Sequence, residues 1–206
     1  MLRISKKKIP DYFSKAKKKV LLPKDSKAWG DENISKIRKQ LRENILNNEQ
    51  LSLCVYCEKK IEASSKSSNI DHIKTKNLFP HLTLCYNNLL VSCNTHGRCS
   101  THKDQYVKNR IDYQRIIDPV TQNPDNYFDY LLTGEIFPKE DLDQKSKKNA
   151  EFTIHIFKLN HKGLCDERKK IALQITEMKN GKMTLENILE FVPDYRTFIQ
   201  HIYPRL

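Results

Sequence analysis

Long apolar runs and glycine are both scarce in this sequence. The 206 residues include five glycines and eight scattered prolines, so no stretch has the composition of a flexible linker. No run approaches the roughly 18 apolar residues that a membrane-spanning helix needs. The first ten residues, MLRISKKKIP, lack the apolar segment of a secretory signal. We therefore expect a cytoplasmic protein with no membrane partner.

Acidic residues are outnumbered, and the imbalance is uneven along the chain. The net charge is +12. Residues 1–60 contain 16 Lys and Arg against 7 Asp and Glu, residues 61–120 contain 8 against 5, and residues 121–206 contain 13 of each. The whole excess thus lies in the first 120 residues. Such a surface is either a solubilising face or the electrostatic footprint of a polyanion such as nucleic acid.

The apolar pattern predicts a mainly helical α+β chain. An apolar side chain recurs every three or four positions within residues 29–50, at Ile34, Ile37, Leu41 and Ile45. This spacing predicts one buried helical stripe, with Asp31 or Asn33 as the N-cap. Further helices are predicted from Ser100 onward and over residues 162–180, 184–192 and 193–203.

Short strands are predicted in the middle of the chain. They fall at residues 69–73 and 87–93, around the Cys54–Cys57 turn and on either side of Gly134. Residues 150–160 are ambiguous, since Phe152, Ile154 and Ile156 alternate as in a strand but lead straight into a helix. The many lysines and the two prolines of residues 1–27 predict a basic, extended arm with one short helix. We expect this arm to contact the phosphates of a nucleic acid.

Five of the six cysteines lie within 46 residues, which indicates a metal site rather than a disulfide framework. Cys54 and Cys57 have the C-x2-C spacing that lets two thiolates face one ion. Cys93 supplies a third thiolate. The fourth ligand is either Cys99 or His96, and thiolate softness favours Cys99. We expect structural zinc on these residues and free thiols at Cys85 and Cys165.

An acidic residue and a histidine stand side by side in NIDHIKTKNLF, at Asp71 and His72. Adjacent strand residues point to opposite faces, so one can face a cleft while the other approaches from its edge. Asn88 follows on the next predicted strand, and His102 and Lys103 come after the last cysteine. A base, a metal-binding carboxylate, an orienting amide and a cation are the groups that phosphodiester hydrolysis requires.

The segments CVYCE, IDHI, NNLLVSC and CSTHK, in this order, resemble the HNH endonucleases. The basic arm, Trp29 and FTIHIFKLNHKGLCDER extend the resemblance to the Septu and retron-associated PtuB-type group, over nearly the full length. The resemblance implies a ββα-metal core with a zinc knuckle, flanked by N-terminal and C-terminal helices. The expected regions are a basic arm and helix (1–50), the nuclease core (51–110) and a helical extension (111–206), packed as one unit.

The resemblance also implies a role for each matching residue. His72 would be the general base, Asp71 would bind a catalytic Mg²⁺ or Mn²⁺ ion, and Asn88 would orient the hairpin. Many HNH proteins place His or Asn directly after the last cysteine, where this chain has Ser100. His102 is then the expected substitute ligand. Lys103 is expected to contact a phosphate of the substrate.

The implied activity is an endonuclease that acts in anti-phage defence. The implied partners are nucleic acid, a PtuA-like ATPase and a retron RNA or DNA component. The substrate stays open between DNA and RNA, including tRNA. A zinc-knuckle module that binds nucleic acid without effective catalysis is the alternative. The set of Asp71, His72 and Asn88 favours the nuclease, whereas Ser100 argues against it.

Overall fold

The computed structural model describes residues 1–206 as a mixed α+β fold with about half of the residues in helices, which confirms the predicted class. The α-helices are α1 (Asp11–Lys18), α2 (Glu32–Glu49), α3 (Cys99–Tyr106), α4 (Gln144–Ile156), α5 (Lys162–Asn180), α6 (Leu185–Phe191) and α7 (Arg196–Ile202). The strands are β1 (Ser68–His72), β2 (Leu89–Cys93), β3 (Phe128–Tyr130) and β4 (Ile136–Pro138). Short 3₁₀ helices cover Ser26–Gly30, Pro80–Leu82, Tyr86–Asn88, Asp112–Gln114, Pro124–Asn126 and Tyr203–Arg205.

Helix α2 forms as its apolar stripe predicts. The Asp31 carboxylate accepts a hydrogen bond from the Asn33 backbone N–H at 2.9 Å and caps the helix. Ile34, Leu41 and Ile45 are fully buried. This stripe packs against α1 and β2, so the helix covers one face of the central strand pair.

Strands β1 and β2 form an antiparallel pair in which Ser68 is opposite Cys93 and His72 is opposite Leu89. Every residue of β2 is buried. Leu89 and Val91 belong to the core formed with α1 and α2, whereas Leu90 belongs to a second, larger core. Alternation along the strand therefore places β2 between two apolar clusters.

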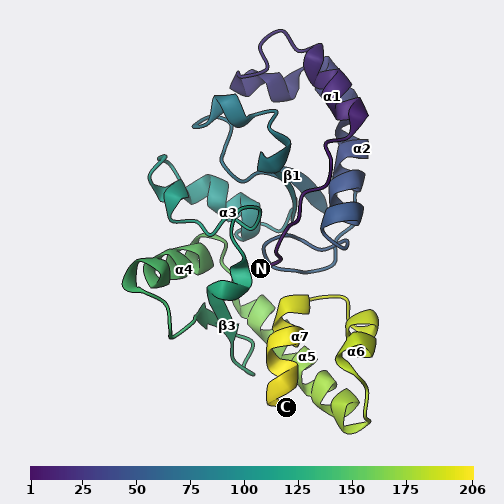
Figure 1. The fold of residues 1–206 in the computed structure, drawn as a ribbon, viewed down its shortest axis with the longest axis vertical. Helices are drawn as coiled ribbons and strands as arrows, with labels where there is room; N and C mark the ends of the chain where they lie inside the picture. The colour runs from purple at the N-terminus through teal and green to yellow at the C-terminus, as the bar shows by residue number, and fades with distance from the viewer.

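The larger core draws residues from all three predicted regions. It includes Met1 and Ile4, the segment around Val55, and Phe198 of α7. The Met1 ammonium group pairs with the Glu58 carboxylate at 2.5 Å. In Figure 1 the N-terminus accordingly lies near the middle of the molecule, between α1 and α2 above and α5 to α7 below.

The basic arm is thus packed along the body of the molecule. Leu2 donates its backbone N–H to Val55, and Ile4 donates to Pro119. Only then does the chain enter α1, whose Lys17 and Lys18 are exposed. None of the helices combines the length and apolar character needed to cross a membrane.

Three local predictions differ from the structure. Residues 150–156 belong to α4, because Ala150, Thr153 and Ile156 form its buried face. Helix α7 begins at Arg196 rather than near Pro193, after Tyr195 adopts a left-handed φ of 55°. Around the cysteine turn a single bridge, between Leu53 and Lys60, replaces the predicted strands. The two short strands around Gly134 are present as β3 and β4.

Candidate functional site

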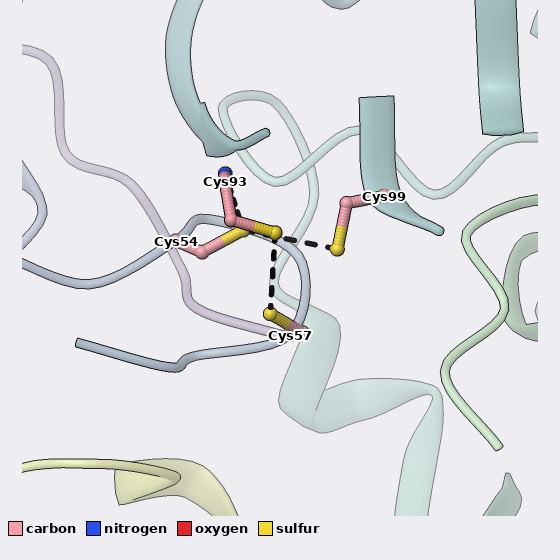
Figure 2. Close-up of side chains that lie close together, drawn as sticks. All are labelled: Cys54, Cys57, Cys93 and Cys99. Carbon is pink, nitrogen blue, oxygen red and sulfur yellow. Dashed lines mark hydrogen bonds between the residues drawn. The ribbon is translucent and has the colours of Figure 1, made fainter. Parts of the chain in front are cut away.

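Four buried cysteine thiols converge between the loop before β1, the end of β2 and the start of α3 (Figure 2). The sulfur of Cys54 lies 3.9 Å from that of Cys99, and the sulfur of Cys57 lies 4.0 Å from that of Cys93. Zn–S bonds of about 2.3 Å in a tetrahedron place sulfurs about 3.8 Å apart. The cluster therefore matches the size and donor type of a zinc site.

The backbone holds the four thiols in place. Cys93 donates its N–H to the Cys54 sulfur at 3.3 Å, which joins the end of β2 to the C-x2-C turn. Cys99 donates its N–H to the Phe157 carbonyl at 3.0 Å, which fixes the start of α3 to the end of α4. His96 is exposed and lies outside the cluster. The structure thus selects Cys99 as the fourth member.

A cleft of about 400 Å³ opens beside β1. Asp71 and His72 both contribute to its wall, so the structure brings these two predicted residues together. The other wall residues come from the segment before α2, from β1 itself, from the β1–β2 connection, and from α3 and the residues that follow it; they include Trp29, Asn69, Lys76, Asp104, Val107 and Lys108.

His72 is held as a neutral imidazole with one defined tautomer. Its Nε2 lies 2.9 Å from the Thr83 carbonyl oxygen, which can only accept, so Nε2 carries the proton. Burial lowers the pKa of His72. The ring also packs edge-on against Trp29, with centroids 4.7 Å apart. The Nδ1 lone pair is therefore available to accept a proton.

Asp71 is buried and hydrogen-bonded through both oxygens. Tyr56 donates its hydroxyl to Oδ2 at 2.5 Å, and Lys103 donates from Nζ to Oδ1 at 2.9 Å. The Lys103 ammonium group also lies 3.2 Å from the Asp104 carboxylate. Partial burial and the Asp71 charge raise the pKa of Asp104. Two carboxylates thus share one buried cation at the edge of the cleft.

Lys103 does not lie where a phosphate contact requires it. Its side chain is fully buried, and Nζ also donates to the His72 carbonyl at 2.6 Å. The structure places it beneath Asp71 rather than at the cleft surface. Its observed contacts instead hold the carboxylate and the end of β1 in position.

His102 is not brought to the cleft. Its Nδ1 bonds the Ile156 carbonyl at 2.8 Å, and its ring stacks on Tyr106 with centroids 4.2 Å apart. Helical phase explains this placement, since residues two apart on a helix face nearly opposite sides. Ser100 and Asp104, four apart, share the side that faces β1, where Ser100 donates to the Asn69 side chain at 3.3 Å.

Asn88 lies just outside the cleft and joins the two ends of the β1–β2 connection. Its Nδ2 donates to the carbonyls of Lys74 at 3.0 Å and Leu82 at 3.2 Å, while its Oδ1 accepts from the Lys74 N–H at 2.9 Å. Leu82 precedes Thr83, which binds His72. The backbone of Leu82 and Thr83 therefore connects the Asn88 side chain to the His72 ring.

Asn69 and Asp104 line the cleft but were not predicted from the sequence. The periodicity of a strand or a helix could have indicated each of them. Asn69 lies two positions before Asp71, so strand alternation places both on one face of β1. Asp104 lies four positions after Ser100, so helix periodicity places it beside the residue that departs from the HNH pattern. The wall of the cleft thus offers oxygen donors from Asn69, Asp71 and Asp104.

Comparison with known proteins gives three curated relatives, while no family model matches the sequence. "Retron Vc95 putative HNH endonuclease" of Vibrio cholerae serotype O1 biovar El Tor is 34% identical over 137 residues, which cover 65% of this chain and 64% of the relative. "Septu protein PtuB" of Bacillus thuringiensis is 28% identical over 145 residues, which cover 69% of this chain and 48% of the relative. "Septu protein PtuB" of Bacillus mycoides (strain KBAB4) is 27% identical over an alignment of 213 positions, which covers 87% of this chain and 67% of the relative.

The alignments thus span from about half to two thirds of the relatives' own lengths. The names of the relatives agree with the resemblance drawn from CVYCE, IDHI, NNLLVSC and CSTHK. At 27–34% identity, the similarity supports a place for this chain in the HNH/Septu PtuB-type family.

Proposed function

We propose that this chain is a metal-dependent HNH endonuclease that hydrolyses phosphodiester bonds. The two strands β1 and β2 followed by α3 have the element order of a ββα core. The observation that carries the proposal is the placement of His72 and Asp71 side by side in one cleft, with the histidine held neutral. The HNH name of one relative supports the same activity.

In this proposal His72 is the general base. The Thr83 carbonyl occupies Nε2–H, so Nδ1 accepts the proton of a water molecule as the water attacks phosphorus. Asn88 keeps the Thr83 segment in place, and perpendicular packing against the Trp29 ring restricts rotation of the imidazole. The histidine is therefore positioned before any substrate arrives.

The catalytic ion would be held by Asp71 together with Asp104, with Asn69 as a further oxygen donor. Carboxylate and amide oxygens are the ligands that Mg²⁺ and Mn²⁺ prefer. Such an ion would supply positive charge to the phosphate and to the leaving oxygen. Asp104 thereby takes the role expected of His102, and Lys103 acts by holding Asp71.

The biological setting follows from the relatives. One is named for a retron and two for Septu. We propose that the chain is the effector of an anti-phage system, together with a PtuA-like ATPase and, in the retron setting, an RNA or DNA component. Its substrate is DNA or RNA, with tRNA included.

A second candidate is a module that binds nucleic acid without cutting it. This candidate is favoured by the contacts of Asp71, both of whose oxygens already have partners in Tyr56 and Lys103. A carboxylate oxygen has a second lone pair for a metal ion, so these contacts do not prevent metal binding. Cleavage assays separate the two candidates.

The test incubates the purified protein, with and without a PtuA-like ATPase, with plasmid DNA and with total RNA. We expect cleavage that requires Mg²⁺ or Mn²⁺ and stops with EDTA. Asp104→Asn should weaken the dependence on the divalent ion, while the matched His102→Gln change on the same helix should not. Binding without cleavage under every condition would establish the second candidate.

A further inference from the structure

One flank of α2 carries two half-buried arginines that have no acidic partner. Arg38 and Arg42 stand four residues apart, and neither forms an ion pair. The Nε atoms of both are buried without a hydrogen-bond partner. Arg38 donates one bond to the Trp29 carbonyl, whereas Arg42 donates none within the chain.

The two guanidinium groups oppose each other electrostatically. Burial and then the neighbouring Arg42 charge lower the pKa of Arg38, and burial lowers that of Arg42 against the opposing influence of Glu43. Like charges four apart on a helix destabilise it. A bound anion would relieve this repulsion and use the free N–H groups.

A shallow pocket faces Arg42 across the loop before β1. Its volume is about 370 Å³, and its lining residues are Lys39, Arg42, Ala63, Ser64 and Ser65. The backbone N–H groups of Ser64 and Ser65 donate to no acceptor of the chain. Free backbone N–H groups next to a guanidinium are the donors that bind phosphate oxygens.

A row of side chains that includes Trp29 leads from the candidate active-site cleft toward this pocket. The guanidinium carbon of Arg38 lies 5.1 Å from the Trp29 ring centroid. Trp29 lines the cleft, and its ring lies 4.7 Å from that of His72. His72, Trp29, Arg38 and Arg42 therefore form a continuous row from the cleft to the pocket.

We propose that Arg38, Arg42 and the Ser64–Ser65 backbone bind successive backbone phosphates of the nucleic-acid strand whose phosphodiester bond lies in the cleft. The arginines are separated by about 6 Å along the helix axis, so they can reach phosphates of neighbouring nucleotides. Trp29 then lies beside the nucleotide between this phosphate site and His72. The inference rests on the proposed nuclease function for the nature of its ligand.

The test compares the wild type with Arg42→Gln and with Arg38→Gln/Arg42→Gln. Arg42 makes no bond within the chain, so the single variant keeps the fold, which circular dichroism checks. The matched control is Lys169→Gln/Lys170→Gln, which removes two exposed charges from α5. Fluorescence anisotropy measures the Kd of a labelled oligonucleotide, as single strand and as duplex, across a range of salt concentrations.

Loss of two phosphate contacts should reduce the slope of log K against log salt by about 1.4 for a single strand and about 1.8 for a duplex. Affinity at 0.1 M salt should fall on the order of 10-fold or more. The control should match the wild type in slope.

The outcomes separate this inference from the proposed function. One outcome is that the wild type binds and cuts while the arginine variants keep its Kd and its salt dependence. In that case the proposed phosphate site is wrong and the proposed nuclease function is retained. If the control loses as much slope as the double arginine variant, binding is diffuse and the site is again wrong. If the wild type binds neither oligonucleotide, both the site and the nuclease function are overturned.

Discussion

Lys103 is the buried cation of the candidate site, and its ammonium group pairs with the buried Asp71 carboxylate at 2.9 Å. Burial alone would lower the pKa of Lys103, but the charges of Asp71 and Asp104 outweigh it and raise that pKa. The ammonium group also bonds the carbonyls of His72 and Ile73 at 2.6 Å and 3.3 Å. One side chain of α3 therefore fixes both the carboxylate and the strand that carries it.

Replacing Lys103 by Met should strongly destabilise the protein. The substitution leaves the Asp71 carboxylate buried without its cation, at a cost of about 3–5 kcal/mol in the free energy of unfolding. Urea denaturation measures this loss. Lys108→Met, an exposed lysine one turn further on, should change stability by less than about 0.5 kcal/mol. Equal stabilities for the two variants would refute the buried pair.

Single residues of the site differed in how well the sequence predicted them. The cysteine spacing predicted most of the thiol cluster, since C-x2-C geometry is local. The choice of Cys99 over His96 rested on ligand softness, and the structure places Cys99 in the cluster. Motif matching pointed to His102, but helical phase separates His102 from β1 and places Asp104 on the wall of the cleft. The inward direction of Lys103 depends on Asp71, 32 residues away, so no local pattern could show it.

At the scale of elements, Asn88 determines the shape of the long β1–β2 connection. Three hydrogen bonds join its side chain to the backbone of Lys74 and Leu82. Ile73 donates its backbone N–H to the Asn88 carbonyl at 3.0 Å, which extends the strand pair by one further bond. The Asn88 amide therefore holds the segment that carries Thr83. The Thr83 carbonyl in turn sets the tautomer of His72.

Asn88→Ala should loosen this connection without removing any group from the cleft. Two backbone carbonyls and one N–H lose partners, which costs about 1–3 kcal/mol. Amide hydrogen exchange should show lost protection at Lys74, with cleavage reduced in parallel. Asn87→Ala is the adjacent control, because the Asn87 side chain is exposed. An Asn88 variant with the exchange pattern of wild type would contradict the orienting role.

Element boundaries were predictable where one helical stripe or one cap dominated. Helix α2, with its Asp31 cap, and helix α5, ending at Gly181, lie where the pattern placed them. The pattern of residues 150–156 was ambiguous because Ile154 and Ile156 alternate with polar residues, as in a strand. The buried face of α4 instead includes Ala150 and Thr153. Thr153 is buried through its bond to the Ile117 N–H, a tertiary contact that hydropathy does not show.

At the scale of the whole molecule, the thiol cluster connects segments that belong to the larger core. Cys57→Ser should abolish binding of about one zinc ion per chain and unfold the protein, because such sites contribute folding free energy. Metal analysis and circular dichroism measure the two effects. Cys165→Ser should keep both metal and fold, since Cys165 lies outside the cluster. A folded, metal-free Cys57→Ser protein would disprove a structural zinc site.

His201 of α7 joins the C-terminal helices to β3 in a pH-dependent way. Its ring lies between Asp125 at 3.6 Å and Asp129 at 3.1 Å, and these carboxylates raise the pKa of His201. The Tyr130 ring packs against the histidine ring, and Arg205 pairs with Asp129 at 2.5 Å. The folded protein therefore holds the His201 proton more tightly than the unfolded chain does.

The stabilisation from His201 is complete below the unfolded pKa of about 6.5 and disappears as pH rises through the higher folded pKa. His201→Gln should therefore lower the free energy of unfolding by about 1 kcal/mol or less near pH 6, and by a smaller amount near pH 9. Urea denaturation at the two pH values measures the difference. His81→Gln, at an exposed histidine without an ion pair, should show no such dependence. If His201→Gln lowers the free energy of unfolding equally at both pH values, the charged His201 does not stabilise the fold through Asp125 and Asp129.

The most direct test of the nuclease proposal is the cleavage rate of His72→Ala under single-turnover conditions with Mg²⁺ or Mn²⁺. Loss of the base should reduce the rate on the order of 10²-fold or more, while zinc content, fold and nucleic-acid binding stay as in the wild type. His81→Ala, at an exposed histidine outside the cleft, should cut at the wild-type rate. Cleavage by His72→Ala at the wild-type rate, with the same metal requirement, would show that His72 is a structural residue and not the base.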